Sequence, residues 1–385
     1  MWAGDDVVIV HDWFGGMGGA EAVLRELASL FPSAPILTLF ADRRSLVSLG
    51  IDPARVRESY LGRIPHALRF RRFLLPWFAD AVQTLDVGDA RLIISSSHAV
   101  AKGVPHKSYQ AHLAYTHSPM RYAHDLMPNY VRSAPRILRP WLRSVLRRLA
   151  VWDVMTAQGV GRFVANSRAV AQRILRTYRR RALVIHPPVD VTRIPFTSRE
   201  RDDYYVALSR LVAYKRLDIA VAAAASLGRR LVVVGEGPER TRLEALARRL
   251  GAAKTTNFLG QVSDGQKWEL LGRARALLFP GEEDFGIVGV ESLATGTPVV
   301  ALGRGGMLDV LGSTCGPLLG GPPRQEPGGV VFAEQSPSSL ANAIRTLEES
   351  GSPDFAAHQS LAERFAVARF RKRMLVVARR LLDST

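Results

Sequence analysis

The stretch Gly281-Glu282-Glu283-Asp284-Phe285-Gly286-Ile287-Val288-Gly289-Val290-Glu291 follows an apolar run, Ala274 to Phe279, and precedes Ser292-Leu293-Ala294. The apolar run is typical of a buried strand, and residues 292–294 indicate the early part of a helix. Acidic residues and glycines therefore stand where a strand ends and a helix begins, which is where α/β sheets bind ligands. Gly286 would let the backbone approach a ligand, and the helix N-terminus would offer N–H groups to an anion. Glu283 and Glu291 could hold two groups of hydroxyls along one elongated ligand.

The spacing of Glu283 and Glu291, eight positions apart, resembles the signature of retaining glycosyltransferases of family 4, which have the GT-B fold. Asp284-Phe285-Gly286 inside the pair and Gly296-Thr297-Pro298-Val299-Val300-Ala301 behind it belong to the same pattern. The resemblance covers nearly the whole chain. It departs at Gly289, where relatives often have proline, and at residues 312–329, which read as a flexible loop rich in glycine and proline. The alternative is an acidic surface loop before an ordinary helix.

Length and composition favour two globular domains. The chain has 385 residues, of which 47% are hydrophobic, and its single cysteine, Cys315, excludes an intrachain disulfide and a cysteine metal cage. We expect no signal peptide at the N-terminus, and no stretch reaches the roughly 18 to 20 apolar residues that span a bilayer. The net charge is +17, and the excess lies in the first 200 residues, with 28 basic and 15 acidic side chains against 24 and 20 in the rest. This predicts an anionic partner: nucleic acid, a membrane surface or a phosphorylated substrate.

A glycine-rich loop, Gly15-Gly16-Met17-Gly18-Gly19, follows a predicted strand over 7–10 and precedes an amphipathic helix. It matches neither the dinucleotide-binding pattern nor the Walker loop, which argues against NAD and ATP. The family resemblance implies that this loop, with Gly18 and Gly19, faces the donor diphosphate and the transferred sugar. A tight turn without a ligand is the alternative.

Two stretches mix arginine with large apolar residues, 68–78 and 136–148. Basic charge beside exposed aromatic residues is typical of a membrane-interface segment. A core helix with a solvated basic face explains the same pattern equally well.

Residues 91–98 and 112–117 read as strands that end in polar residues, and the second continues as Thr116-His117-Ser118-Pro119-Met120-Arg121-Tyr122. This run is similar to a bacterial subgroup of family 4 that includes many mannosyltransferases for surface polysaccharides. The resemblance implies that His117 contacts the donor sugar, and His98 and His124 are weaker candidates. A structural histidine bonded to the backbone is the alternative.

The second half restarts the alternation of strand and helix. A strand over 204–208 is followed by Arg210 and Lys215 and then a helix over 217–227, so the two cations converge at the mouth of the sheet, where they could hold a diphosphate as it leaves. The family carries the same arginine and lysine spacing in this role, and two solvated charges are the alternative. A short strand over 257–262 places Val262 beside the nucleotide base by the same resemblance.

Both halves therefore predict an α/β fold with two doubly wound parallel sheets, the GT-B fold. We expect an N-terminal, acceptor-side Rossmann-like domain over 1–190, a linker over 191–202 and a nucleotide-sugar-binding domain over 203–361. A terminal helix over 362–385 is expected to pack back on the first domain.

The predicted function is a retaining hexosyltransferase that uses a nucleotide-diphosphate sugar as co-substrate, with no cofactor. The resemblance implies that Glu291 holds the ribose, Arg210 and Lys215 the diphosphate, and Glu283 with the N–H groups of Phe285, Gly286 and Ile287 the sugar. It favours mannose from GDP-mannose, transferred to a polyprenyl-diphosphate-linked oligosaccharide in exopolysaccharide or lipopolysaccharide assembly. A UDP-sugar donor such as UDP-glucose, a sugar-nucleotide epimerase and a basic nucleic-acid-binding protein are the alternatives.

No Asp-x-Asp pair occurs in the sequence, so we expect no catalytic metal. The expected location is cytoplasmic, on the inner face of the cell membrane, through an anionic lipid surface. No nucleic acid partner is expected.

Overall fold

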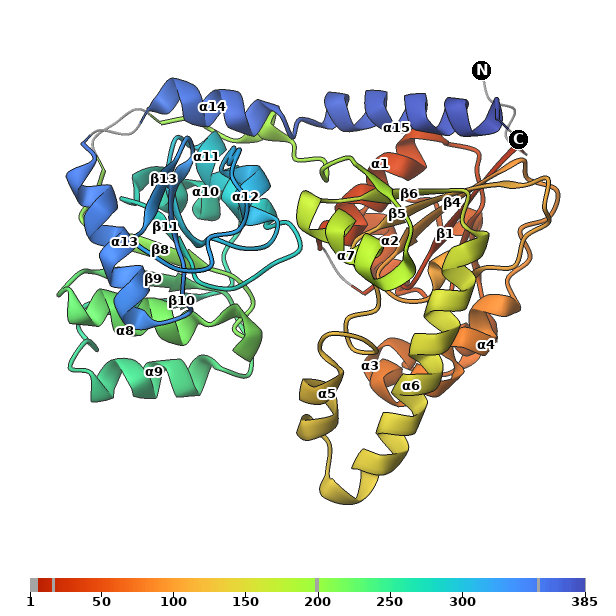
Figure 1. Cartoon of the computed structure of the whole chain (residues 1–385), viewed down its shortest axis with the longest axis horizontal. Coiled ribbons are helices and arrows are strands. Elements are labelled where there is room, and N and C mark those ends of the chain that lie inside the picture. The colour runs from red at the N-terminus through yellow and green to blue at the C-terminus, as the bar shows by residue number, and fades with distance from the viewer. Residues whose placement is uncertain (1–5, 16–17, 198–200, 352–353, 385) are drawn as a thin grey trace. The chain divides into compact units, whose positions relative to one another are not determined.

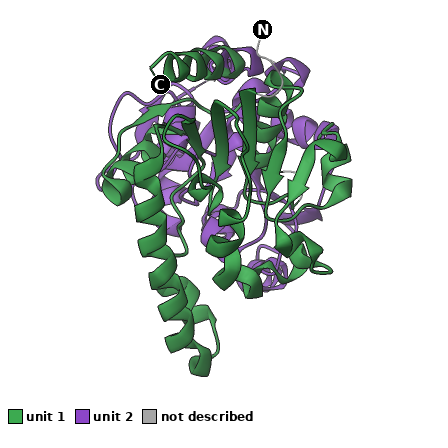
Figure 2. Cartoon of the chain, turned by 90° about the vertical axis from the view of Figure 1, so that its right-hand side faces the viewer, with its two compact units in different colours: residues 1–188, 370–385 green, residues 189–369 purple. Residues whose placement is uncertain are grey.

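The computed structural model describes residues 6–15, 18–197, 201–351 and 354–384. It contains two compact units: unit 1 comprises Met1–Pro188 with Phe370–Thr385, and unit 2 comprises Val189–Arg369 (Figures 1 and 2). Gly16 and Met17 of the predicted glycine loop and residues 198–200 of the predicted linker lie outside the described residues.

Unit 1 is built on a seven-stranded sheet in the order β3-β2-β1-β4-β5-β6-β7, in which every neighbouring pair is parallel. The central strands are buried along their whole length and begin with apolar residues, as expected when helices cover both sides of a parallel sheet. The strands are β1 (Val7–His11), β2 (Ile36–Thr38), β3 (Val56–Glu58), β4 (Leu92–Ser97), β5 (Ala111–Thr116), β6 (Arg162–Ala165) and β7 (Ala182–Val184).

The last helix of the chain completes one face of this unit. Phe370, Met374 and Ala378 of α15 share a core with Val7 and Ile9 of β1, and Arg371 lies 2.6 Å from Glu26 of α1. The helices of unit 1 are α1 (Gly19–Leu30), α2 (Arg43–Ser48), α3 (Ala67–Leu74), α4 (Phe78–Gln83), α5 (Met127–Ser133), α6 (Arg139–Thr156), α7 (Arg168–Tyr178) and α15 (Val367–Leu382).

Unit 2 is built on a second seven-stranded sheet, in the order β10-β9-β8-β11-β12-β14-β13. All its pairs are parallel except β13 with β14. The strands are β8 (Tyr205–Leu208), β9 (Leu231–Val234), β10 (Thr256–Gly260), β11 (Leu277–Phe279), β12 (Val299–Leu302), β13 (Arg324–Glu326) and β14 (Gly329–Phe332). The helices are α8 (Leu217–Ser226), α9 (Arg240–Arg249), α10 (Asp264–Arg273), α11 (Ile287–Ala294), α12 (Met307–Val310), α13 (Pro337–Glu349) and α14 (Phe355–Glu363).

The two doubly wound sheets confirm the predicted α/β fold class. Three local predictions were wrong. Residues 292–294 end α11 rather than begin it, because Gly286 already caps that helix. The stretch 312–329 contains β13, which pairs with β14 as an antiparallel edge strand.

The third wrong prediction concerns the terminal helix, which is expected to run without a break from residue 362. The chain leaves helical geometry after Glu363 and resumes it at Val367. Between the two helices, Phe365 is buried against the ring of Phe285, and its carbonyl accepts a hydrogen bond from the backbone N–H of Val189 at 2.9 Å. These long-range contacts override local helix propensity, which is why the pattern of residues did not show the break.

Candidate active site

Three loops of unit 2 meet at the carboxyl ends of β8, β11 and β12. The acidic loop between β11 and α11 lies against Gly306 after β12, whose N–H donates to the carbonyl of Glu283 at 2.8 Å. A Cβ atom at Gly306 would come within 2.2 Å of the Asp284 carbonyl oxygen, so only glycine permits this approach. The acidic loop is thus held in place by its backbone, which leaves its carboxylates for other contacts.

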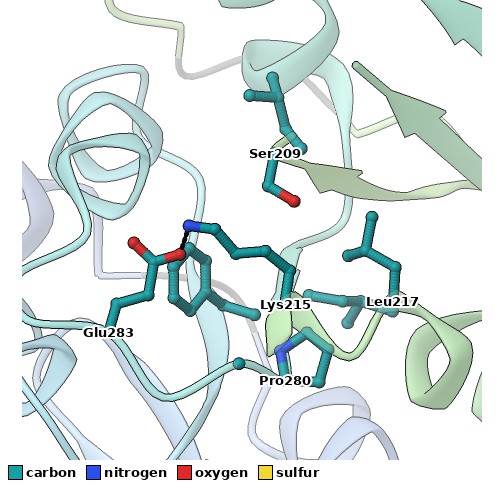
Figure 3. A pocket seen from close by; sticks show the side chains of 9 residues that line it. Ser209, Lys215, Leu217, Pro280 and Glu283 are labelled. Carbon is teal, nitrogen blue, oxygen red and sulfur yellow. Dashed lines mark ion pairs between the residues drawn. The ribbon is translucent and has the colours of Figure 1, made fainter. Parts of the chain in front are cut away.

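Lys215 and Glu283 are in direct contact at this edge of the sheet. The Lys215 Nζ atom meets Glu283 Oε1 across a small pocket that Ser209, Leu217 and Pro280 also line (Figure 3). Both side chains are largely buried, with 14% and 17% of their surfaces exposed. The structure therefore brings together a predicted diphosphate ligand and the predicted sugar ligand.

Lys215 lies in an unusual electrostatic environment. Burial and the positive charge of Arg210 lower the pKa of Lys215 to about 8, whereas Asp284 raises it. The Glu283 carboxylate in contact with the ammonium group also favours the charged form. Arg210 itself is exposed and donates a hydrogen bond to the Tyr214 hydroxyl at 3.3 Å. The pair of cations is suited to a bound anion, because one is fixed in the pocket and the other is open to solvent.

Gly286 starts α11 in a left-handed conformation, with φ of +94°. A side chain there would be strained and would come within 2.6 Å of Met307 Cε. The helix that begins at Ile287 directs its first N–H groups back toward the acidic loop. The side chain of Phe285 is buried against Phe365, so only its backbone is available to a ligand.

Glu291 lies on α11, and its side chain is 11% exposed. Lys267 of α10 places its Nζ atom 2.5 Å from Glu291 Oε1. Burial raises the pKa of Glu291, and Lys267 acts against that rise. No sequence pattern marked Lys267, because a lysine early in an exposed helix is ordinary.

Val262 lies in a second depression of unit 2, of about 530 Å³, which Leu259, Gln261 and Gln266 also line. It directly precedes Ser263, the residue that caps α10. The predicted base contact therefore stands next to the helix that carries Lys267.

In unit 1, His117 lies just beyond β5, and its side chain is mostly buried. Its Nε2 atom is 2.9 Å from Ser96 Oγ, and its carbonyl accepts a hydrogen bond from Asn166 at 3.0 Å. Burial, together with His98 and His11, lowers the pKa of His117 well below its usual value, so the ring is neutral at physiological pH.

Asp12 is a structural residue at the same edge that the sequence did not mark. Its buried carboxylate accepts hydrogen bonds from four successive backbone N–H groups, those of residues 98–101, at 2.6 to 2.9 Å. It also lies 3.0 Å from His98 Nδ1. His124 contacts Asp153, which is fully buried and pairs with Lys102 as well. These contacts give His98 and His124 structural partners.

Gly18 and Gly19 form the start of α1, Gly18 as the N-cap and Gly19 as the first residue of the helix. Both are exposed, and no side chain caps this helix end. They belong to unit 1, as does His117, whereas the other predicted site residues belong to unit 2.

Among the residues that the structure describes, no group of three or more His, Cys, Asp and Glu side chains is arranged to hold a metal ion. Over the same residues, no helix has the length and apolar character to cross a membrane.

Residues 190–365, almost all of unit 2, match the family model of glycosyl transferases group 1. Unit 2 is therefore similar to glycosyl transferases group 1 over almost its whole length. A GDP-mannose-dependent alpha-(1-6)-phosphatidylinositol dimannoside mannosyltransferase of Mycobacterium tuberculosis is 33% identical over 149 residues, 37% of this chain and 34% of that protein. Glycogen synthase of the same species is 32% identical over 177 residues, 43% of this chain and 39% of that protein. The chain thus spans little more than a third of the length of these relatives.

Solved structures match over the whole chain at low identity. Anabaena HepE in complex with UDP-glucose has a TM-score of 0.67 and 18% identity, and the match covers 98% of this chain and 100% of that one. Sucrose-phosphate synthase from Thermosynechococcus elongatus has a TM-score of 0.70 and 18% identity, with coverage of 99% and 100%. These matches confirm the GT-B fold.

Proposed function

We propose that the protein is a retaining, metal-independent hexosyltransferase whose donor is a nucleoside-diphosphate sugar. The observation that carries this proposal is the contact of Lys215 with Glu283 beside Arg210, at the start of α11. A cation suited to a leaving phosphate and a carboxylate suited to sugar hydroxyls lie at one edge of the sheet, in the unit that matches glycosyl transferases group 1. An acidic surface loop alone would not bury this pair.

The proposed chemistry is departure of the nucleoside diphosphate. Lys215, Arg210 and the first N–H groups of α11 stabilise the negative charge that develops on the phosphate, and such preorganised groups supply most of the catalytic effect. The family resemblance implies that the acceptor hydroxyl attacks the sugar on the face from which the diphosphate leaves. The leaving phosphate then takes the proton of that hydroxyl. The new glycosidic bond then keeps the configuration of the donor.

The sugar is assigned to Glu283 and to the N–H groups of Phe285, Gly286 and Ile287. From unit 1 we assign His117 a contact with the sugar, and Gly18 and Gly19 a role beside the diphosphate. The neutral imidazole of His117 suits a contact with the sugar, because it can both donate and accept a hydrogen bond. Glu291 is assigned to the ribose hydroxyls and Val262 to the base.

We infer that the donor is GDP-mannose and the acceptor a lipid-linked oligosaccharide in bacterial polysaccharide assembly. The run from Thr116 to Tyr122 and the GDP-mannose-dependent relative support this choice. UDP-glucose is the competing donor, because a structure with the same fold binds it. Glu283 would accept hydrogen bonds from the equatorial O3 and O4 hydroxyls, which mannose and glucose share. Discrimination between the two donors must therefore come from the nucleotide base and from the axial O2 of mannose.

The donor assignment is tested by competition. Purified protein receives both nucleotide sugars with membrane extract that contains lipid-linked glucose disaccharide, and the product linkage is read by NMR. Transfer of mannose with an α linkage is expected, and it should persist in EDTA. Transfer from UDP-glucose alone would overturn the donor but not the family, and activity restored only by Mn²⁺ or Mg²⁺ would overturn metal independence.

We also propose peripheral attachment to an anionic membrane through two segments of unit 1. The first is α3 with the 3-10 turn at Leu75–Trp77, and the second is the hairpin of α5 and α6, which projects beyond the sheet of its own unit (Figures 1 and 2). Together they expose Phe70, Phe73, Trp77, Tyr130, Ile137, Leu138 and Trp141. No acidic residue occurs between Glu58 and Asp80 or between Asp125 and Asp153, so the charge of both segments is purely basic. This composition suits anionic headgroups.

A further inference from the structure

We propose that Lys267 is a positioning residue for the nucleotide ribose: it keeps the buried Glu291 carboxylate ionised and oriented to accept hydrogen bonds from the 2′- and 3′-hydroxyls of a nucleoside diphosphate. The proposal rests on the proposed function, because Glu291 has its ribose role only there. It adds a residue to which neither the motif nor the family match assigns a role.

The first argument is geometric. Lys267 Nζ lies 2.5 Å from Glu291 Oε1 and 2.9 Å from Asp264 Oδ1. The Asp264 side chain is 74% exposed, whereas Glu291 is 11% exposed, so the contact with Glu291 is the one that solvent screens least. The lysine ammonium group therefore interacts more strongly with the buried Glu291 carboxylate than with Asp264.

The second argument concerns the helix that carries Lys267. Ser263 and Gln266 form a reciprocal capping box at the start of α10, which fixes its first turn. Lys267 follows directly, and its ammonium group lies 5.6 Å from the ring of Trp268. Because α10 packs against α11, the Lys267 ammonium group lies next to the Glu291 carboxylate and is largely shielded from solvent.

The third argument is electrostatic. The elements packed against α11 bring few titratable groups to this region: Asp264, Lys267, Glu269 and Arg273 on α10, Asp309 on α12, and His358 and Glu363 on α14. Of these, Lys267 favours the ionised form of Glu291, and Asp264 opposes it. Burial raises the pKa of Glu291, and a protonated carboxyl would lose acceptor capacity toward two hydroxyls. The lysine cation beside the buried carboxylate therefore favours the ionised form, which accepts hydrogen bonds from both ribose hydroxyls.

The test measures binding by calorimetry with the full-length protein. GDP and UDP are first titrated into the wild type, and the tighter one is then compared with its 2′,3′-dideoxy form from about pH 6 to about pH 9. The variants are Lys267→Met, Lys267→Arg and Glu291→Gln, each checked for an unchanged melting temperature. The readout is the ratio of wild-type to variant affinity at each pH, which cancels the titration of Lys215 and of the phosphate.

Lys267→Met is expected to weaken ribonucleotide binding about 10- to 100-fold at low pH, the range for lost hydrogen bonds to a charged group. The affinity of this variant should approach that of the wild type as pH rises. Its binding of the dideoxy form should equal that of the wild type, and Lys267→Arg should restore ribonucleotide affinity. Glu291→Gln should be weak at every pH. A merely structural lysine would instead weaken both nucleotides alike, without pH dependence.

The outcomes separate this inference from the proposed function. If the wild type binds neither GDP nor UDP, the proposed function fails and the inference with it. If the wild type binds the dideoxy form as tightly as the ribonucleotide, or if Lys267→Met leaves the affinity ratio at one throughout, the inference is overturned while the proposed function stands.

Discussion

At the scale of single residues, the two glutamates of the motif have different environments. Glu283 contacts Lys215 in the pocket at the end of the sheet, and Glu291 lies on a helix against Lys267. Their different partners fit different roles, one beside the reacting sugar and one beside a part of the donor that does not react.

We predict that Glu291→Ala mainly raises KM for the donor and that Glu283→Ala mainly lowers kcat. An interaction made equally in the ground state and the transition state appears in KM, and one made mostly in the transition state appears in kcat. The expected change is about 10- to 100-fold in each case, the range for a hydrogen bond to a charged group. Steady-state kinetics with varied donor measures both, and the reverse pattern would show that the two roles are exchanged.

A second residue-scale prediction concerns pH. The pKa of Lys215 is lowered to about 8 by burial and Arg210, so its positive charge is present below that pH and lost above it. Affinity for a nucleoside diphosphate should therefore fall as pH rises through about 8, with a slope that approaches at most about tenfold per pH unit above that pH. Calorimetric titration measures this fall, and Lys215→Arg should remove it because arginine stays charged. Lys254→Arg, an exposed lysine of the same unit, is the control. Constant wild-type affinity up to about pH 10 would contradict the assignment.

At the scale of elements, the arginine-rich segment around the start of α6 has a buried part and an exposed part. Val145, Leu146 and Leu149 belong to the core of unit 1, as in an ordinary core helix. Trp141, near the start of α6, is 53% exposed, and Ile137, in the 3-10 turn Arg136–Leu138 just before the helix, is 87% exposed. The apolar tip of the hairpin is thus the part that a membrane would cover.

We predict that replacing Arg69, Arg71 and Arg72 with glutamate releases the protein from anionic vesicles at moderate salt. Each well-placed basic residue contributes about 1 kcal/mol at such a surface, so reversing three should weaken binding by two orders of magnitude or more. Vesicle co-sedimentation measures the loss. The matched control reverses three exposed cations of unit 2, Arg248, Arg249 and Lys254, and should bind as the wild type does. Equal loss in both variants would indicate a general charge effect and remove the attachment site.

At the scale of the whole molecule, the end of the chain completes the fold of its beginning. Phe370 of α15 is 2% exposed in the core that contains β1 and α1, although more than 350 residues separate it from β1. We predict that Phe370→Ala lowers the free energy of unfolding of unit 1 by about 3 to 5 kcal/mol, the usual cost of emptying a buried aromatic site.

The control for that prediction is Val376→Ala on the same helix, where the side chain is 43% exposed and the change should stay within about 0.5 kcal/mol. Denaturant unfolding followed by circular dichroism measures both. An equally small effect of Phe370→Ala would mean that unit 1 does not depend on α15 for its stability.

The sequence by itself determined the alternation of strands and helices, and with it the two doubly wound sheets, because apolar strands and glycine turns are local signals. It also brought Lys215 and Glu283 to one place, since parallel strands present their carboxyl ends at the same edge of a sheet. Only the tertiary structure decided where long-range contacts outweigh local preference. The break before Val367 depends on Phe365 packing against Phe285, and the partner of Glu291 comes from another helix. Neither contact has a local signature, because each depends on residues that meet only after the sheet has formed.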